Sequence, residues 1–384
     1  MDIGRGIRLD RLELAGAFGD IGTDLPLIVG IILASGLDPA SALIAFGVMQ
    51  VSTALAYRMP MPVQPLKAMA AIVIAQKVAA PVLFGAGLAI GVIMLVISAA
   101  GLLDWLGRLV PKTVIRGVQF GLGLQLGLLA CRDYIPAAGP QGLALAAVCF
   151  AGVLALGSHR RYPAALVVIA VGVVYAAVTG LDVGAIQRGF GLSWITVRTP
   201  AIPDVLTGLV LLALPQIPLS LGNSILATRQ VAHDLFPDRH LGLRRIGLTY
   251  AAMNLVNPFI GGIPTCHGSG GMAGHYAFGG RTGGSVLLYG GLFLLIGLFF
   301  AGAFTEVIRV FPMPVLGVLL LGEALALMRL LSDVDRTGSN LAIALLVGLA
   351  AVGLPYGYLV GLVGGTAIER LSRDGRLRWF DDLR

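Results

Sequence analysis

The chain has 384 residues, of which 57% are hydrophobic and only 12% are charged, and its mean hydropathy is +0.89. A water-soluble fold of this size cannot cover so much apolar surface with so few charges, so the composition excludes a soluble domain and predicts a polytopic membrane protein. The formal net charge of +7 comes from short basic clusters between apolar stretches, a pattern that fixes orientation in a membrane and argues against nucleic-acid binding.

Apolar stretches follow one another along the whole chain, punctuated by Gly or Pro about every twenty residues. This pattern predicts an all-α polytopic membrane protein with about 14 transmembrane segments. The predicted spans are residues 14–34, 40–57, 62–76, 82–103, 113–131, 141–157, 163–180, 205–228, 246–260, 264–279, 285–304, 312–328, 338–353 and 355–369.

The distribution of basic residues predicts the orientation of these spans. With the N-terminus in the cytoplasm, most lysines and arginines fall in the cytoplasmic connections. Those on the opposite side are Lys77, Arg132, Arg188, Arg198 and Arg309. Because positive charge concentrates on the inner side of membrane proteins, we expect a cell-membrane protein with both termini in the cytoplasm.

The sequence repeats itself weakly at an offset near 200 residues. Residues 81–88 (PVLFGAGL) resemble 285–292 (SVLLYGGL), and residues 111–115 (PKTVI) resemble 312–316 (PMPVL). Because each half holds an odd number of spans, seven, the second copy must enter the membrane upside down, which is the inverted repeat of secondary transporters. We expect the first repeat at residues 1–182, a connecting loop at 183–204 and the second repeat at 205–384.

Two proline-containing segments at equivalent places in the halves are poor interiors for a continuous helix. They are residues 59–69 (MPMPVQPLKAM) and 261–274 (GGIPTCHGSGGMAG). Such prolines suit an extended stretch that leads into a half-helix beginning near mid-membrane. Two half-helix starts facing each other would direct unpaired N–H groups at one point and hold an anion without a metal.

Small and polar residues in these segments are the candidate binding groups. Gly268 and Gly270 would let the backbone approach a ligand closely, and Gln64, Thr265 and Ser269 could donate hydrogen bonds to oxyanion oxygens. The alternative role for the glycines is tight packing between membrane helices.

Four further polar residues of the second half are weaker candidates. Asn223 and Ser224 could line the site as neutral donors or make hydrogen bonds between helices. His267 could contact substrate or a proton, or it could be a hydrogen-bonded core histidine. Cys266 precedes it, but consecutive residues do not face each other on a helix, which argues against a nucleophile and base pair.

Charged residues inside the spans are costly in lipid, so each is expected to have a partner or a function. Asp20 and Asp24 lie four apart on one helical face, where they could bind or relay a coupling proton, pair with Lys67 or cap a broken helix. Lys67 could raise the positive potential of an anion site, pair with Asp20 or Asp24, or extend toward the membrane surface. Glu323 is an isolated acid that could gate transport or pair with a cation.

The three cysteines, Cys131, Cys149 and Cys266, are far apart and lack the spacing of metal ligands. They support neither a disulfide framework nor a zinc site. We therefore expect no redox chemistry, no metal and no cofactor.

Several motifs together resemble the molybdate transporter family, a branch of the sulfate permease superfamily. They are residues 14–23 (LAGAFGDIGT), 61–67 (MPVQPLK), 222–225 (GNSI), 263–276 (IPTCHGSGGMAGHY) and 278–283 (FGGRTG). The resemblance covers both halves of the chain and extends to the order of the motifs.

This resemblance implies a seven-plus-seven inverted repeat with a core domain, from spans one to four and eight to eleven, and a gate domain. It also implies an anion site between spans three and ten, an elevator-like movement of the core, and a chain without the C-terminal regulatory domain of sulfate permeases. Asp24 departs from the family pattern, which leads us to expect an uncharged residue there.

The expected function is therefore secondary transport of a tetrahedral oxyanion, either molybdate or sulfate, and not an enzymatic reaction. A nucleobase permease of the same fold is the alternative. It would need a carboxylate in the region of spans eight to ten to bind the ring nitrogens, and Asn223 and His267 occupy that region instead. An intramembrane enzyme is a third option, with Cys266, His267 and Ser269 as its only nearby set. The oligomeric state stays open, with a homodimer as one option.

Overall fold

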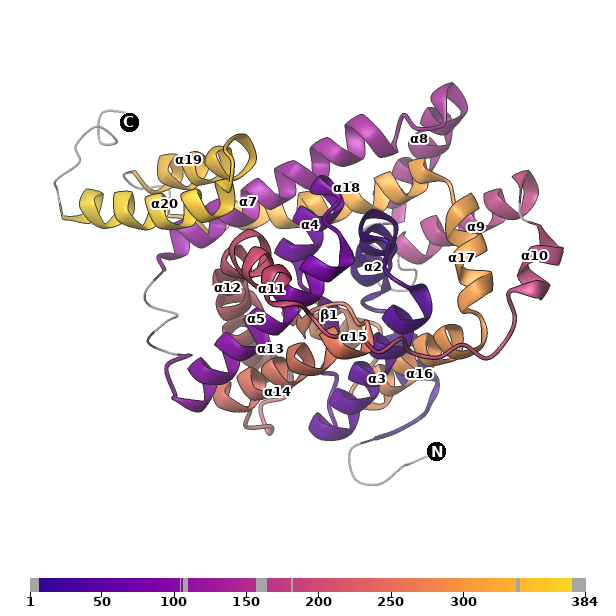
Figure 1. Cartoon of the computed structure of the whole chain (residues 1–384), viewed down its shortest axis with the longest axis horizontal. Helices are drawn as coiled ribbons and strands as arrows, with labels where there is room; N and C mark the ends of the chain where they lie inside the picture. The colour runs from indigo at the N-terminus through magenta and orange to yellow at the C-terminus, as the bar shows by residue number, and fades with distance from the viewer. Residues whose placement is uncertain are drawn as a thin grey trace.

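The computed structural model describes residues 7–103, 105, 110–156, 164–180, 182–335 and 339–374. Within these residues the chain is built of helices, with one two-stranded sheet near the centre of the molecule (Figure 1). Some arginines of the orientation pattern lie outside the described residues, namely Arg5, Arg108, Arg160, Arg161, Arg336, Arg376, Arg378 and Arg384.

The first half of the chain holds one of the two strands. Its elements are α1 (Arg11–Ala17), α2 (Ile21–Ser35), α3 (Pro39–Tyr57), β1 (Val63–Pro65), α4 (Lys67–Gln76), α5 (Ala80–Ala99), α7 (Lys112–Leu129), the π-helix η1 (Ala130–Tyr134), α8 (Gly139–Leu156) and α9 (Ala164–Thr179). A short helix, α10 (Val183–Arg188), lies in the connection between the halves.

The second half holds the other strand and more irregular helix. Its elements are α11 (Ile202–Gly208), η2 (Leu209–Ala213), α12 (Leu214–Leu219), η3 (Ser220–Leu226), α13 (Ala227–Leu235), α14 (Leu243–Val256), η4 (Asn257–Ile260), β2 (Thr265–His267), α15 (Ser269–Ala277), α16 (Gly284–Phe299), α17 (Ala301–Val310), α18 (Met313–Arg329), η5 (Leu330–Asp333), α19 (Asn340–Gly353) and α20 (Gly357–Arg373).

Local sequence explains where the first helices begin and end. The Asp10 side chain caps α1 by accepting hydrogen bonds from two backbone amides, and Asp38 caps α3 in the same way at Ser41. Pro39 fits the first position of α3 because its missing N–H would be unpaired there. Helix α2 ends at Gly36, whose φ of 71° is accessible to glycine at little cost.

Several helices have the length and apolarity to cross a bilayer. Among the described residues there are six such helical runs, or eight if the bent pairs α1–α2 and α16–α17 each form one span. Helices α4 and α15 have only 10 and 9 residues, which agrees with the prediction of half-helices in these segments.

Helices from opposite halves of the chain pack together in two groups. The first helix group comprises α1–α5 and α11–α16, in which α3 packs on α16 and α5 packs on α11 and α14. The second helix group comprises α7–α9 and α18–α20, in which α7 packs on α18 and α19 along the upper side of Figure 1. Glycines permit these close approaches, since a Cβ on Gly47 of α3 would lie 2.8 Å from the Gly290 carbonyl of α16.

The end of predicted span 285–304 departs from a single straight helix. Helix α16 stops at Phe299, and α17 continues at an angle of 94°. The physical reason is a close contact between α17 and the connection after α10, where a Cβ on Gly302 would lie 2.8 Å from the Gly189 carbonyl. Ala303 N–H donates to the same carbonyl at 3.3 Å.

The two strands join the halves of the chain in the first helix group. β1 pairs antiparallel with β2, with Val63 opposite His267, Gln64 opposite Cys266 and Pro65 opposite Thr265. All six strand residues are buried. Prolines in and before these segments exclude a helical hydrogen-bond ladder, so the backbone runs extended until α4 and α15 begin.

Amide side chains satisfy backbone groups of both strands that would otherwise be unpaired. Gln50 of α3 accepts from the Val63 N–H at 3.0 Å and donates to the Val63 carbonyl at 2.7 Å. Asn254 of α14 binds Thr265 in the same two-way manner, at 3.0 and 2.6 Å. Each half of the chain thus supplies amide side chains that make an extended segment tolerable away from water.

Candidate functional site

Two half-helices begin beside the sheet. Because β1 and β2 run antiparallel and each leads directly into a half-helix, α4 and α15 begin on opposite sides of the same strand pair. The residues preceding the helices, Leu66 and Gly268, both have extended backbone conformations, and neither provides a capping side chain. The N-terminal amides of each helix therefore need a partner from elsewhere.

Helix α4 obtains its cap from the second half of the chain. The Gln216 Oε1 accepts hydrogen bonds from the Ala68 N–H at 2.9 Å and the Met69 N–H at 3.2 Å. Gln216 Nε2 in turn donates to Ser220 Oγ at 3.1 Å, which fixes the orientation of the amide. A neutral side chain therefore already pairs with two of the α4 amides that the sequence predicted to be available to an anion.

Helix α15 begins without such a cap. Ser269, at its first position, donates from Oγ to Asn223 Oδ1 at 3.3 Å. Gly270 is exposed, and a Cβ placed on it would meet no atom within 4 Å, so open space adjoins the helix start. Of the two half-helices, α15 is therefore the one whose first turn has no side-chain cap in the described part of the chain.

A carboxylate lies against this open start. Gln64 Nε2 donates to both oxygens of Asp20, at 2.6 and 2.7 Å. A Cβ on Gly268 would lie 1.9 Å from Gln64 Oε1, and one on Gly271 would lie 2.1 Å from Asp20 Oδ2. The glycines therefore leave room for the Gln64–Asp20 pair, in addition to bringing the α15 backbone close to any ligand.

Lys67 pairs with the second helix group. Its Nζ lies 2.7 Å from Glu323 Oε1 of α18, and the two side chains are 17% and 7% exposed. Thr23 of α2 donates to the other Glu323 oxygen at 3.4 Å. The partner of Lys67 is therefore Glu323, and not Asp20 or Asp24 as one sequence-based alternative had it.

Asp24 is fully buried and binds a different residue. Tyr289 OH of α16 donates to Asp24 Oδ2 at 3.2 Å. His275 of α15 packs edge-on against the same tyrosine, with ring centroids 5.9 Å apart. Asp24 thus lies inside the first helix group, whereas Asp20 adjoins the start of α15.

The β2 side chains point into the first helix group. Thr265 Oγ1 accepts from Asn257 at 3.1 Å, and Cys266 lies within hydrogen-bonding reach of Ser224. His267 Nε2 is 2.7 Å from Thr249 Oγ1, and Nδ1 is 3.4 Å from the Pro62 carbonyl.

These contacts separate the predicted site residues into two sets. Gln64, Ser269, Gly270 and Asn223 lie around the α15 start, whereas the side chains of Thr265 to His267 are held within the protein. Successive strand side chains point to opposite faces, so Cys266 and His267 do not form a nucleophile and base pair. No group of three His, Cys, Asp or Glu side chains is placed to hold a metal within the part of the chain that the structure describes.

Reasoning from the sequence missed Gln216 and the partner of Lys67. A weak signal for Gln216 exists, because it is an uncharged polar residue between Pro215 and Pro218 in an apolar span. The pairing of Lys67 with Glu323 joins residues 256 positions apart, so it depends on the packing of the two helix groups and has no local signature.

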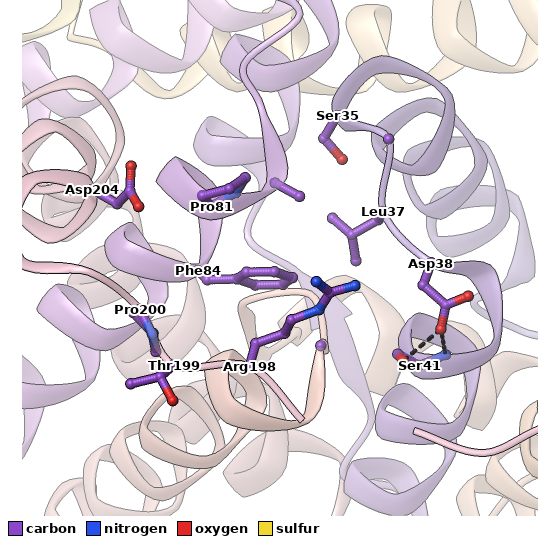
Figure 2. Close-up of a pocket in the computed structure, with 13 residues that line it drawn as sticks. Ser35, Leu37, Asp38, Ser41, Pro81, Phe84, Arg198, Thr199, Pro200 and Asp204 are labelled. Atoms are coloured by element: carbon purple, nitrogen blue, oxygen red, sulfur yellow. Dashed lines mark hydrogen bonds between the residues drawn. The ribbon is translucent and has the colours of Figure 1, made fainter. Parts of the chain in front are cut away.

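A polar cavity lies apart from the half-helix starts. It has a volume of about 420 Å³ and lies where α2 ends and where α3, α5 and α11 begin. Figure 2 shows Arg198 reaching into it beside Phe84, with Asp38 and Asp204 on its walls. None of the predicted binding residues lines this cavity.

Comparison with known protein families identifies relatives over most of the chain. Residues 12–126 and 208–327 match the family described as "Molybdate transporter of MFS superfamily". "Molybdate transporter 1" of Arabidopsis thaliana is 31% identical over 92% of this chain and 86% of its own length. "Molybdate transporter 2" of the same plant is 32% identical over 84% of this chain and 79% of its own length. These relatives are transporters and not enzymes.

Solved structures show the fold. The transmembrane domain of the cyanobacterial bicarbonate transporter BicA superposes with a TM-score of 0.66 at 17% identity, covering 90% of this chain and 97% of that domain. SLC26A9 superposes with a TM-score of 0.68 at 14% identity, covering 96% of this chain and 66% of that protein. The chain therefore belongs to the molybdate transporter family and has the multi-pass membrane fold of BicA and SLC26A9, as its motifs indicated.

Proposed function

We propose that this protein is a secondary transporter that moves molybdate across the cell membrane and binds it at the start of α15. The observation that carries the proposal is the uncapped half-helix start beside open space at Gly270. Backbone amides at such a start hydrogen-bond oxyanion oxygens, and the helix dipole favours negative charge there. The named activity of the plant relatives favours molybdate over sulfate, which has the same shape and charge.

The charges around the site favour proton coupling. Asp20, Asp24 and Glu323 are buried, and Lys67, which is 17% exposed, pairs with Glu323. If all four were ionised they would sum to a net negative charge. A dianion entering beside Asp20 would meet repulsion that the low-dielectric surroundings strengthen. A proton on Asp20 removes that repulsion and offsets the inside-negative potential that opposes anion entry.

Movement of the first helix group against the second would give alternating access. In this proposal the first group is the core domain of a seven-plus-seven inverted repeat, the second is the gate domain, and both termini are cytoplasmic. The Lys67–Glu323 and Thr23–Glu323 contacts cross the boundary between the groups. An elevator-like step would break or rearrange these contacts while leaving the β1–β2 pair intact.

Uptake into proteoliposomes tests the proposal. We expect the purified protein to accumulate molybdate, and we expect sulfate but not uracil to compete. Uracil uptake would support a nucleobase permease, and turnover of a substrate without transport would support an enzyme. Either outcome, or no accumulation of any oxyanion, would contradict the proposed function.

Replacing Asp20 tests its role as the proton acceptor. Wild-type uptake should rise when the outside is acidified, because protonation removes a negative charge beside the anion. In Asp20→Asn the side chain is always neutral, so uptake should lose most of this dependence on external pH. Asp374→Asn, which removes an exposed carboxylate at the end of α20, is the matched control and should behave as wild type. A wild-type pH profile in Asp20→Asn would assign the coupling elsewhere.

A further inference from the structure

A cluster of basic side chains lies where α13 ends and α14 begins. A pocket of about 410 Å³ is lined there by Arg229, Gln230 and His233 of α13 and by residues 239–242 after it. Helical spacing places Arg229 and His233 on one face of α13, and the chain then turns so that Arg239 and His240 line the same pocket. The pocket is separate from the half-helix starts and from the cavity of Figure 2.

The two arginines of this pocket form no ion pair within the residues that the structure describes. Neither Arg229 nor Arg239 has a carboxylate within 4.0 Å in the described portion of the chain. The nearest acid on α13, Asp234, accepts from Gln230 at 2.8 Å and lies 3.6 Å from His233. Two guanidinium groups around one polar hollow match the oxygens of a phosphate group, which arginine binds through paired charge-assisted hydrogen bonds.

A neighbouring face of α13 contacts the elements of the transport site. Ala232 packs in a cluster with Met272 of α15 and with Met59 and Met61, which precede β1. A single helix therefore carries both the basic pocket and a packing contact with α15. The irregular π-helix η3, which contains Asn223, leads directly into it.

We propose that this basic pocket, defined by Arg229, His233, Arg239 and His240, binds a phosphate group and thereby sets the rate of transport. A bound phosphate would hold α13 to the turn that follows it and so stabilise one position of α13 against α15. The same chemistry is present in the headgroup of an anionic phospholipid and in free inorganic phosphate. Anionic lipid headgroups give the cytoplasmic membrane surface a negative potential, which attracts basic side chains such as these. The proposal is independent of which anion is transported.

The test combines binding and uptake with a matched pair of variants. The double variant Arg229→Gln/Arg239→Gln removes both pocket charges, whereas Arg244→Gln removes an exposed charge in the first turn of α14 that does not line the pocket. Binding of inorganic phosphate and of short-chain phosphatidylglycerol is measured by calorimetry. Uptake is measured in neutral phosphatidylcholine vesicles, in vesicles containing phosphatidylglycerol, and in neutral vesicles with added phosphate.

We expect the double variant to bind the probe at least about tenfold more weakly, from the loss of two charge-assisted hydrogen bonds, and to lose the response of uptake to it. Arg244→Gln should retain both. A response to phosphatidylglycerol alone identifies the lipid headgroup, and a response to phosphate identifies the free ion. No binding to wild type, or an equal loss in Arg244→Gln, would overturn the proposal.

A second variant distinguishes phosphate binding at the basic pocket from phosphate binding at the transport site. A Gly268→Ala protein, altered at the start of α15, should still bind the probe at the basic pocket. If that binding persists while oxyanion uptake fails, the pocket stands independently of the transport site. If Arg239→Gln alone, at an exposed position that does not threaten folding, leaves probe binding unchanged, the pocket assignment is wrong.

Discussion

Gly268→Ala is expected to reduce molybdate binding and uptake by at least about tenfold. The backbone at Gly268 has a φ of −111°, which alanine adopts without strain, so the effect is steric. The new Cβ would lie 1.9 Å from Gln64 Oε1 and would force that side chain away from Asp20. The displaced side chain and the added methyl group would then crowd the start of α15, where the anion is proposed to bind. Uptake and equilibrium binding by the same purified protein measure the loss.

Gly291→Ala is the control for this experiment. It adds the same methyl group to a different helix, α16, into space with no atom within 4 Å, and alanine favours the helix over glycine. This variant should fold as well as wild type and retain most of its uptake. Equal loss in both variants would show that the effect is not specific to the start of α15, and normal binding by Gly268→Ala would remove the Gln64–Asp20 pair from the site.

Lys67→Met is expected to destabilise the protein by about 2–3 kcal/mol, because it leaves Glu323 buried without its cation. Removing one partner of a fully buried ion pair would destabilise the protein more. The expected loss of stability is smaller here because Lys67 is 17% exposed and solvent screens its charge. Uptake should fall strongly as well, since this pair connects the first helix group to the second. Thermal unfolding in detergent and uptake in proteoliposomes measure the two effects separately.

Two comparisons make the Lys67 experiment decisive. Lys112→Met removes a surface cation that is 65% exposed and 4.0 Å from Asp333, and it should change stability by less than about 1 kcal/mol. Lys67→Met/Glu323→Leu removes both charges, so stability should return toward wild type while uptake stays low. Wild-type stability and uptake in Lys67→Met would show that the ion pair is dispensable.

The sequence made the broken segments predictable because proline and glycine act locally. The prolines around Gln64 and Thr265 exclude continuous helices, and the strands and half-helices begin within a few residues of the predicted places. The approximate spans followed from hydropathy, which also depends on nearby residues. The α17 bend was not predictable, because it depends on a backbone contact between Gly189 and Gly302, 113 residues apart.

The positions of the two half-helix starts were predictable, and the contacts of the side chains around them were less so. The resemblance and the Pro-Gly pattern both indicated the starts of α4 and α15. They did not indicate that Gln216 caps α4, which makes the two half-helix ends unequal. Nor did they show that Gln64 binds Asp20 beside the α15 start, whereas Thr265 binds Asn257 inside the protein. Such choices depend on which side chains the tertiary packing brings within 3 Å, and no local pattern records that.

The strand pair has a consequence for biosynthesis. Pro65 and Thr265 pair across 200 residues of chain, so β1 emerges from the ribosome long before its partner exists. At synthesis rates of about 5–20 residues per second, the first strand waits roughly 10–40 seconds with an incomplete edge inside the lipid. Unpaired peptide groups are costly there, and during that interval the two hydrogen bonds between Gln50 and Val63 can already protect part of β1, because both residues belong to the first half.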